Sequence, residues 1–352
     1  MNDRTRVLAA VGMTVLLFLG VQLGALALIE PFHDSERQAV DDPENPTNSL
    51  VYFAIILVAT GFMLATFRYD LEWLIRATII GVSVMLAWFV LTEFVPPVVT
   101  VGSTNALAAL AALGVGAALL VYPEWYVIDL TGVLMGAGAA ALFGISFGLL
   151  PAILLLSVLA IYDAISVYRT EHMLDLAEGV MDLKIPVVLV IPTTLSYSYL
   201  AAGSTDDVLE EETDGDSSTA DESGCSSHAG EGDEPAESAD ESRPESADRD
   251  DAADLERDAL FIGLGDAVIP TILAASAAYF LDAGALEVPG IALNVPALGA
   301  ILGTIAGLLV LMHMVLKGRP HAGLPLLNGG AIGGYLLGAL ASSLSIATAL
   351  GL

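Results

Sequence analysis

Long apolar runs separated by short polar stretches dominate this chain. A helix rises about 1.5 Å per residue and must cross roughly 30 Å of hydrocarbon, so runs of about twenty residues predict membrane spans. The pattern therefore predicts an all-α polytopic membrane protein with nine transmembrane helices. The expected spans are residues 7–29, 50–67, 72–95, 104–122, 126–147, 149–169, 259–281, 296–316 and 324–350.

Two stretches between the sixth and seventh spans depart from this pattern. Residues 171–183 mix acids with leucines and predict a surface helix. The β-branched run from Ile185 to Ile191, between prolines and too short to span, predicts an extended strand.

Charge is concentrated in one segment. The formal net charge is -30, yet 22 of the 42 acidic residues lie within residues 206–258. This composition cannot bury a core, so we expect a disordered, solvated loop. Such acidity disfavours nucleic acid and anionic lipid as partners and is typical of proteins from salt-loving microbes.

The basic residues predict the orientation of the helices. With the N-terminus and the acidic loop in the cytoplasm and the C-terminus outside, all cations except Arg37 fall on the cytoplasmic side, as the positive-inside rule requires. The cytoplasmic cations are Arg4, Arg6, Arg68, Arg76, Arg169, Lys184, Arg243, Arg249, Arg257, Lys317 and Arg319.

Carboxylates inside a span are candidates for chemistry, because an ionised acid in hydrocarbon is costly. Asp163 and Asp266 lie well inside the sixth and seventh expected spans. The other membrane-adjacent acids lie near predicted helix ends, where water is reachable, and are expected to be structural or interfacial. These are Glu30, Glu72, Glu93, Glu124 and Asp129.

Two neighbouring carboxylates suit aspartic-protease chemistry, because one keeps a proton while the other acts as a base toward a shared water. The glycines before Asp266 loosen the helix and let a substrate strand approach. A buried pair alone could equally relay protons in a transporter. At this point both readings stay open.

The surrounding motifs resemble one family. The run Ile161-Tyr162-Asp163-Ala164 is similar to the Tyr-Asp motif on the sixth helix of presenilins and signal peptide peptidases, and it continues as in microbial presenilin homologues. Gly263-Leu264-Gly265-Asp266 resembles their Gly-x-Gly-Asp motif on the seventh helix.

A proline motif opens the ninth helix in this family, and two copies compete for that role. Pro325-Leu326-Leu327 stands in the expected place, with leucine where the family has alanine. A literal Pro296-Ala297-Leu298 opens the eighth span instead, and we interpret it as a packing motif.

The resemblance implies an intramembrane aspartyl endopeptidase that cuts transmembrane helices of other proteins. It assigns catalysis to Asp163 and Asp266 and places Tyr162, Gly263, Leu264, Gly265, Pro325, Leu326 and Leu327 at the substrate site. It implies no metal or cofactor. We expect residues 1–203 and 258–352 to be the two membrane parts, joined by the acidic loop at 204–257.

Other protease classes fit the residues less well. Gly144-Ile-Ser146-Phe-Gly148 matches the Gly-x-Ser-x-Gly pattern of serine hydrolases, but it lies inside an expected helix and suits glycine packing. The lone Cys225 and the unpaired histidines disfavour a zinc site. A prepilin peptidase also uses Gly-x-Gly-Asp, but its cytoplasmic cysteine cluster is missing. A proton-coupled transporter remains the non-enzyme alternative, without the internal repeats typical of that class.

Overall fold

A computed structural model describes residues 3–40, 42–69, 71–102, 104–169, 186–192, 259–315 and 323–351 of the 352-residue chain. The expected surface helix at 171–183 and the acidic segment at 204–257 lie outside these residues.

The described chain is mainly helical, and seven of its helices are long and apolar enough to cross a membrane. This confirms the polytopic membrane class. The spans expected at 104–122 and 259–281 appear as shorter apolar helices, α4 and α10, so length and composition alone identify seven of the nine predicted spans among the described residues. The apolar helices are α1 (Asp3–Asp34), α2 (Thr47–Arg68), α3 (Glu72–Phe94), α4 (Ala106–Val121), α5 (Trp125–Ser146), α6 (Leu149–Arg169), α10 (Leu264–Phe280), α11 (Val295–Val315) and α12 (Gly323–Ala341). A final short helix is α13 (Ile346–Ala349).

Two small antiparallel ladders accompany the helices: β1 (Thr100–Val101) pairs with β2 (Thr104–Asn105), and β3 (Val188–Pro192) pairs with β4 (Ala259–Gly263). The strand predicted at 185–191 is confirmed for residues 188–191, whereas 186 and 187 form a turn.

The prediction that residues 259–263 are helical was wrong, because they form β4. These five apolar residues gain ladder hydrogen bonds from β3, and α10 begins only after Gly263.

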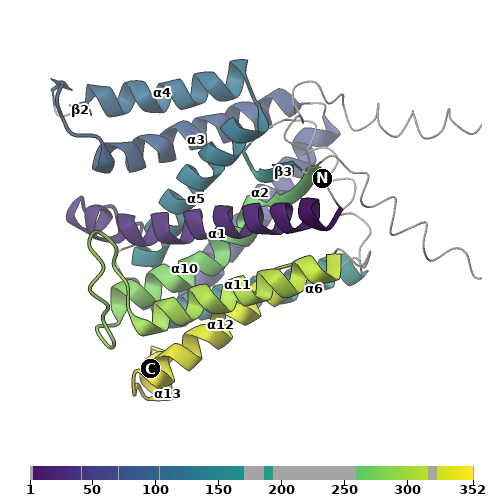
Figure 1. Ribbon diagram of the computed structural model, residues 1–352. Helices are drawn as coiled ribbons and strands as arrows, with labels where there is room; N and C mark the ends of the chain where they lie inside the picture. The colour runs from purple at the N-terminus through teal and green to yellow at the C-terminus, as the bar shows by residue number, and fades with distance from the viewer. Residues whose placement is uncertain are drawn as a thin grey trace, which may run out of the picture.

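The helices form one bundle in which α1 runs through the middle (Figure 1). In the view of Figure 1, α3 and α4 lie above α1, whereas α11 and α12 lie below it. The N-terminus and β3 lie at one end of the bundle, and the C-terminus lies at the other. The α12 helix begins at the end that carries β3.

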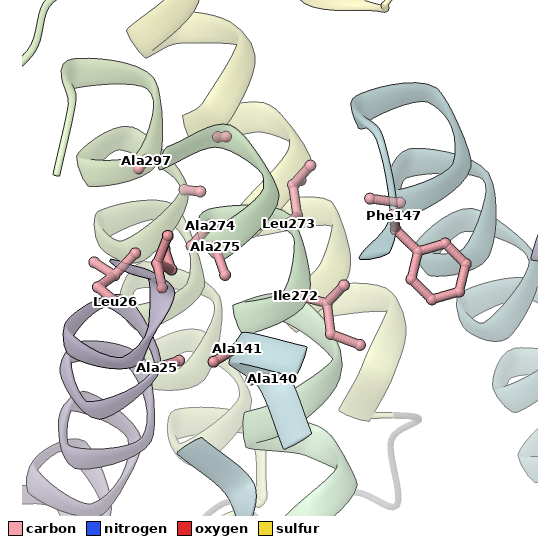
Figure 2. Packing of buried hydrophobic residues seen from close by; sticks show 14 of the residues in the cluster. Ala25, Leu26, Ala140, Ala141, Phe147, Ile272, Leu273, Ala274, Ala275 and Ala297 are labelled. Carbon is pink, nitrogen blue, oxygen red and sulfur yellow. The ribbon is translucent and has the colours of Figure 1, made fainter. Parts of the chain in front are cut away.

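The core is built around α10. Figure 2 shows α10 residues among small side chains from α1, α5 and α11. Small residues let helix backbones approach closely, which is how helices associate in lipid. The labelled members of this cluster, all buried, are Ala25, Leu26, Ala140, Ala141, Phe147, Ile272, Leu273, Ala274, Ala275 and Ala297.

Glycines hold α11 against α12. A methyl group on Gly303 would overlap the carbonyl oxygen of Gly330, and one on Gly334 would overlap that of Gly299. The two backbones therefore touch with no side chain between them. We call this contact the glycine seam; its members are Gly299, Gly303, Gly307, Gly330, Gly334 and Gly338.

Candidate active site

Asp163 lies in the last two turns of α6, with a side chain that is 8% exposed. Its Oδ2 accepts a hydrogen bond from the backbone N–H of Leu324 at 3.2 Å. Leu324 belongs to the first turn of α12, where the N–H groups have no partner within their own helix. One carboxylate is therefore anchored by the start of another helix.

Asp266 lies in the first turn of α10, directly after β4. The sequence placed it inside a span, whereas the structure places it at a strand-to-helix junction. A Cβ added to Gly323 would lie 3.5 Å from Asp266 Oδ2, so this carboxylate also borders the start of α12. Leu324, which donates to Asp163, is the residue next to Gly323. The structure thus brings the two predicted acids together from α6 and α10.

The first two turns of α12 also carry Pro325-Leu326-Leu327. Leu327 is fully buried, and its Cα and the Leu326 carbonyl oxygen lie against Gly307 of α11. The motif directly follows Gly323 and Leu324, the two residues that lie beside the carboxylates.

The literal Pro296-Ala297-Leu298 lies elsewhere. It opens α11, where Pro296 packs against Gly338. Gly338 is fifteen residues along α12 from Gly323, or about 22 Å at the helical rise. Asn294 accepts a hydrogen bond from Ala297 N–H and donates to the Ala277 and Leu281 carbonyl oxygens, which ties α10 to α11. The interpretation of this copy as a packing motif agrees with its position.

The remaining predicted site residues differ in their surroundings. Tyr162 is 40% exposed, and its ring meets Phe53 of α2 edge-on at 6.0 Å, so the side chain is directed at α2. Leu264 is buried, with Gly132 and Gly136 of α5 beside it, and is a core residue.

Two of the predicted glycines are accessible. Gly263 and Gly265 are exposed beside Asp266. Backbone of this kind can be reached by a ligand that approaches the carboxylates.

Asp129 was misjudged from the sequence. We expected it at a water-accessible helix end, yet it is 2% exposed and its Oδ1 accepts the Val190 N–H of β3 at 2.7 Å. The signal available was a lone acid four residues inside an apolar helix, which is unusual without a partner.

Ser146 of the Gly-x-Ser-x-Gly pattern is fully buried at the end of α5. Its hydroxyl donates to the Leu142 carbonyl oxygen and accepts the Ala39 N–H. Gly144 packs against Ala275 of α10. A hydroxyl bound in this way is not presented as a nucleophile, which supports the packing interpretation.

Comparison with known proteins agrees with this geometry. Residues 15–344 match the family model described as signal-peptide peptidase, presenilin aspartyl protease. The chain belongs to this family. No curated protein matches the chain.

Solved structures of family members are similar over almost the whole chain. One is a presenilin family intramembrane aspartate protease in space group C222, with 28% identity, a TM-score of 0.60, and coverage of 94% of this chain and 99% of the other. A presenilin family intramembrane aspartate protease in space group P2 gives 30% identity, a TM-score of 0.56, and coverage of 93% and 96%. The chain is therefore a multi-pass membrane protein with a presenilin-like protease fold.

Proposed function

We propose that this chain is an endopeptidase that hydrolyses peptide bonds within transmembrane segments of other proteins, using Asp163 and Asp266 and an activated water. The observation that carries the proposal is the meeting of these two carboxylates at the first turn of α12. Family membership favours a protease over a proton-coupled transporter with the same two acids.

The chemistry follows from the shared proton. One carboxylate takes a proton from water, whose oxygen attacks the scissile carbonyl carbon, while the protonated partner donates to the carbonyl oxygen. Collapse of the tetrahedral intermediate breaks the C–N bond, and the amine nitrogen receives a proton from the dyad. No metal or cofactor is part of this scheme.

Substrate binding is proposed beside β4. A transmembrane helix must unwind before its peptide bonds can be attacked, and an extended segment can add to a sheet edge. The strand β4 leads directly into Asp266, and Gly263 and Gly265 are exposed there. A strand beside β4 would therefore run toward the carboxylates, with Pro325 to Leu327 bordering the cleft.

We further propose that the site faces the cytoplasmic half of the membrane, with the N-terminus and residues 204–257 in the cytoplasm and the C-terminus outside. The N-terminus and the β3 end of the bundle lie together, opposite the C-terminus (Figure 1). With Cys225 replaced by serine, labelling of single cysteines placed in the loop between α10 and α11 or near the N-terminus, in sealed vesicles, tests this orientation.

The decisive experiment uses purified protein and a transmembrane reporter peptide. Asp163→Asn and Asp266→Asn should each abolish cleavage while the circular dichroism spectrum stays native. Glu93→Gln is the matched control. The Glu93 carboxylate forms an ion pair with Arg37, with 3.1 Å between the two side chains, and it is not part of the dyad. This substitution should therefore leave turnover unchanged. Substantial cleavage by either folded Asn variant would refute the mechanism.

A further inference from the structure

A third buried carboxylate, that of Asp129, lies near the site but outside the proposed chemistry. One of its oxygens accepts the Val190 N–H at 2.7 Å. The other, Oδ2, is buried and makes no hydrogen bond within the described part of the chain. Buried polar atoms are normally satisfied, so an acid kept here is expected to serve a purpose beyond packing.

The register of the β3–β4 ladder shows which edge Asp129 contacts. Leu264 N–H donates to the Val187 carbonyl oxygen at 2.7 Å, and Val188 lies opposite Gly263. Backbone groups alternate in direction along an antiparallel strand, so those of Val190 point away from β4. The Asp129 carboxylate thus occupies the edge of β3 that is opposite to β4.

The same strand is connected to the catalytic junction through packing. A Cβ on Gly132, one turn along α5 from Asp129, would lie 3.1 Å from Leu189 and 3.8 Å from Leu264. Leu264 follows β4 directly and precedes Asp266 by two residues. A shift of β3 along α5 would therefore move β4 and Asp266 with it.

We propose that Asp129 is a positioning residue of the protease. By accepting the Val190 N–H it occupies the edge of β3 opposite to β4, and it thereby sets where a bound substrate strand meets the dyad. Because that edge is occupied, a substrate strand adds only beside β4. This inference rests on the proposed function. A slip of one residue moves a strand by about 3.3 Å, enough to present the neighbouring peptide bond to the water.

The test maps cleavage sites by mass spectrometry for the wild type, Asp129→Ala and Asp129→Asn, with kcat and KM for each. Asp129→Ala should add cut sites shifted by one or more residues and lower kcat/KM by roughly 10- to 100-fold, as expected for a lost bond to a charged group. Asp129→Asn should keep the main cut site, because its amide oxygen can accept the same hydrogen bond.

Ser276→Ala is the matched control. Ser276 of α10 is buried and its hydroxyl donates to the Phe147 carbonyl oxygen at 2.8 Å, so its loss also removes a buried bond to a backbone group. It should change stability and leave the cut sites alone. Shifted cut sites in this variant as well would show a general loosening and overturn a specific role for Asp129.

Hydrogen exchange of a peptide covering β3, measured without substrate, gives a readout independent of activity. Exchange at Val190 should rise in Asp129→Ala and stay near the wild-type rate in Asp129→Asn. Unchanged cut sites in Asp129→Ala overturn the inference whatever the exchange shows. If that variant does not fold, altered cut sites in folded Asp129→Asn overturn it instead. Cleavage that survives Asp163→Asn would count against the proposed function, a separate failure.

Discussion

The glycine seam allows a sharp prediction, because a neighbouring glycine of α12 that lies outside the seam provides the control. A Cβ on Gly334 would overlap the Gly299 carbonyl oxygen and lie 2.9 Å from Gly303 Cα. A Cβ on Gly333, the preceding residue, would meet nothing within 4 Å. A Gly→Ala substitution at each of these adjacent positions therefore separates the effect of the α11–α12 contact from the effect of replacing a helix glycine.

The magnitudes follow from the two distances. Carbon atoms pack at about 3.5–4.0 Å, so Gly334→Ala must separate the two backbones by roughly 1 Å. Forcing an extra methyl into a packed contact costs about 1–3 kcal/mol. Gly333→Ala should instead be neutral or stabilising by up to about 1 kcal/mol, because alanine favours helices more than glycine does.

Activity should respond more strongly than stability. Leu324 of α12 donates to Asp163, and Gly323 borders Asp266, so separating α12 from α11 moves the first turn of α12 relative to the dyad. A displacement of about 1 Å at a catalytic site can lower turnover roughly 100-fold. We expect such a loss in Gly334→Ala and near-normal turnover in Gly333→Ala.

The assay combines thermal unfolding in detergent with cleavage of the reporter peptide. Equal effects of the two substitutions on both measurements would refute the reasoning. Such a result would mean that a displacement at the glycine seam does not move the first turn of α12 relative to the dyad.

Three further outcomes are expected. Replacing Pro325 and Leu327 by alanine should lower turnover about tenfold or more with little loss of fold. Replacing Pro296 and Leu298 should lower the melting temperature more than turnover. The reverse result would make Pro296 to Leu298 the motif at the substrate site and Pro325 to Leu327 the packing motif. The rate should follow a bell-shaped pH profile, because one proton is shared by two carboxylates, and a flat profile would contradict a dyad. Shortening residues 204–254 should leave the circular dichroism spectrum in detergent and high salt unchanged, and its loss would show that the loop is structural.

Much of the fold was predictable because lipid imposes simple rules on sequence. Span length, loop charge and acids within apolar runs are local signals. They singled out Asp163 and Asp266 as candidates, and the β-branched run predicted a strand at 185–191, where the structure has β3 over Val188–Pro192. The motif at Pro325 was preferred over that at Pro296 because the family resemblance places such a motif at the ninth span.

What escaped prediction depends on contacts between distant segments. Residues 259–263 continue an apolar run into α10, and a short apolar run does not distinguish strand from helix until its partner β3 is known. Asp129 was expected to be interfacial because the sequence shows only that it lies near a helix end. Its partner is the Val190 N–H of β3, 61 residues away, and this contact is not visible in the local sequence. The role of each glycine likewise depends on which helix lies opposite.

The start of α12 touches both carboxylates, and this has a consequence for biosynthesis. Asp163 is made early, Asp266 about a hundred residues later, and Leu324 later still. During translation, the backbone groups that position the two acids are absent until α12 has entered the membrane. A chain that has not yet inserted α12 would therefore be inactive, and the protease would become able to cleave only after α12 is in place.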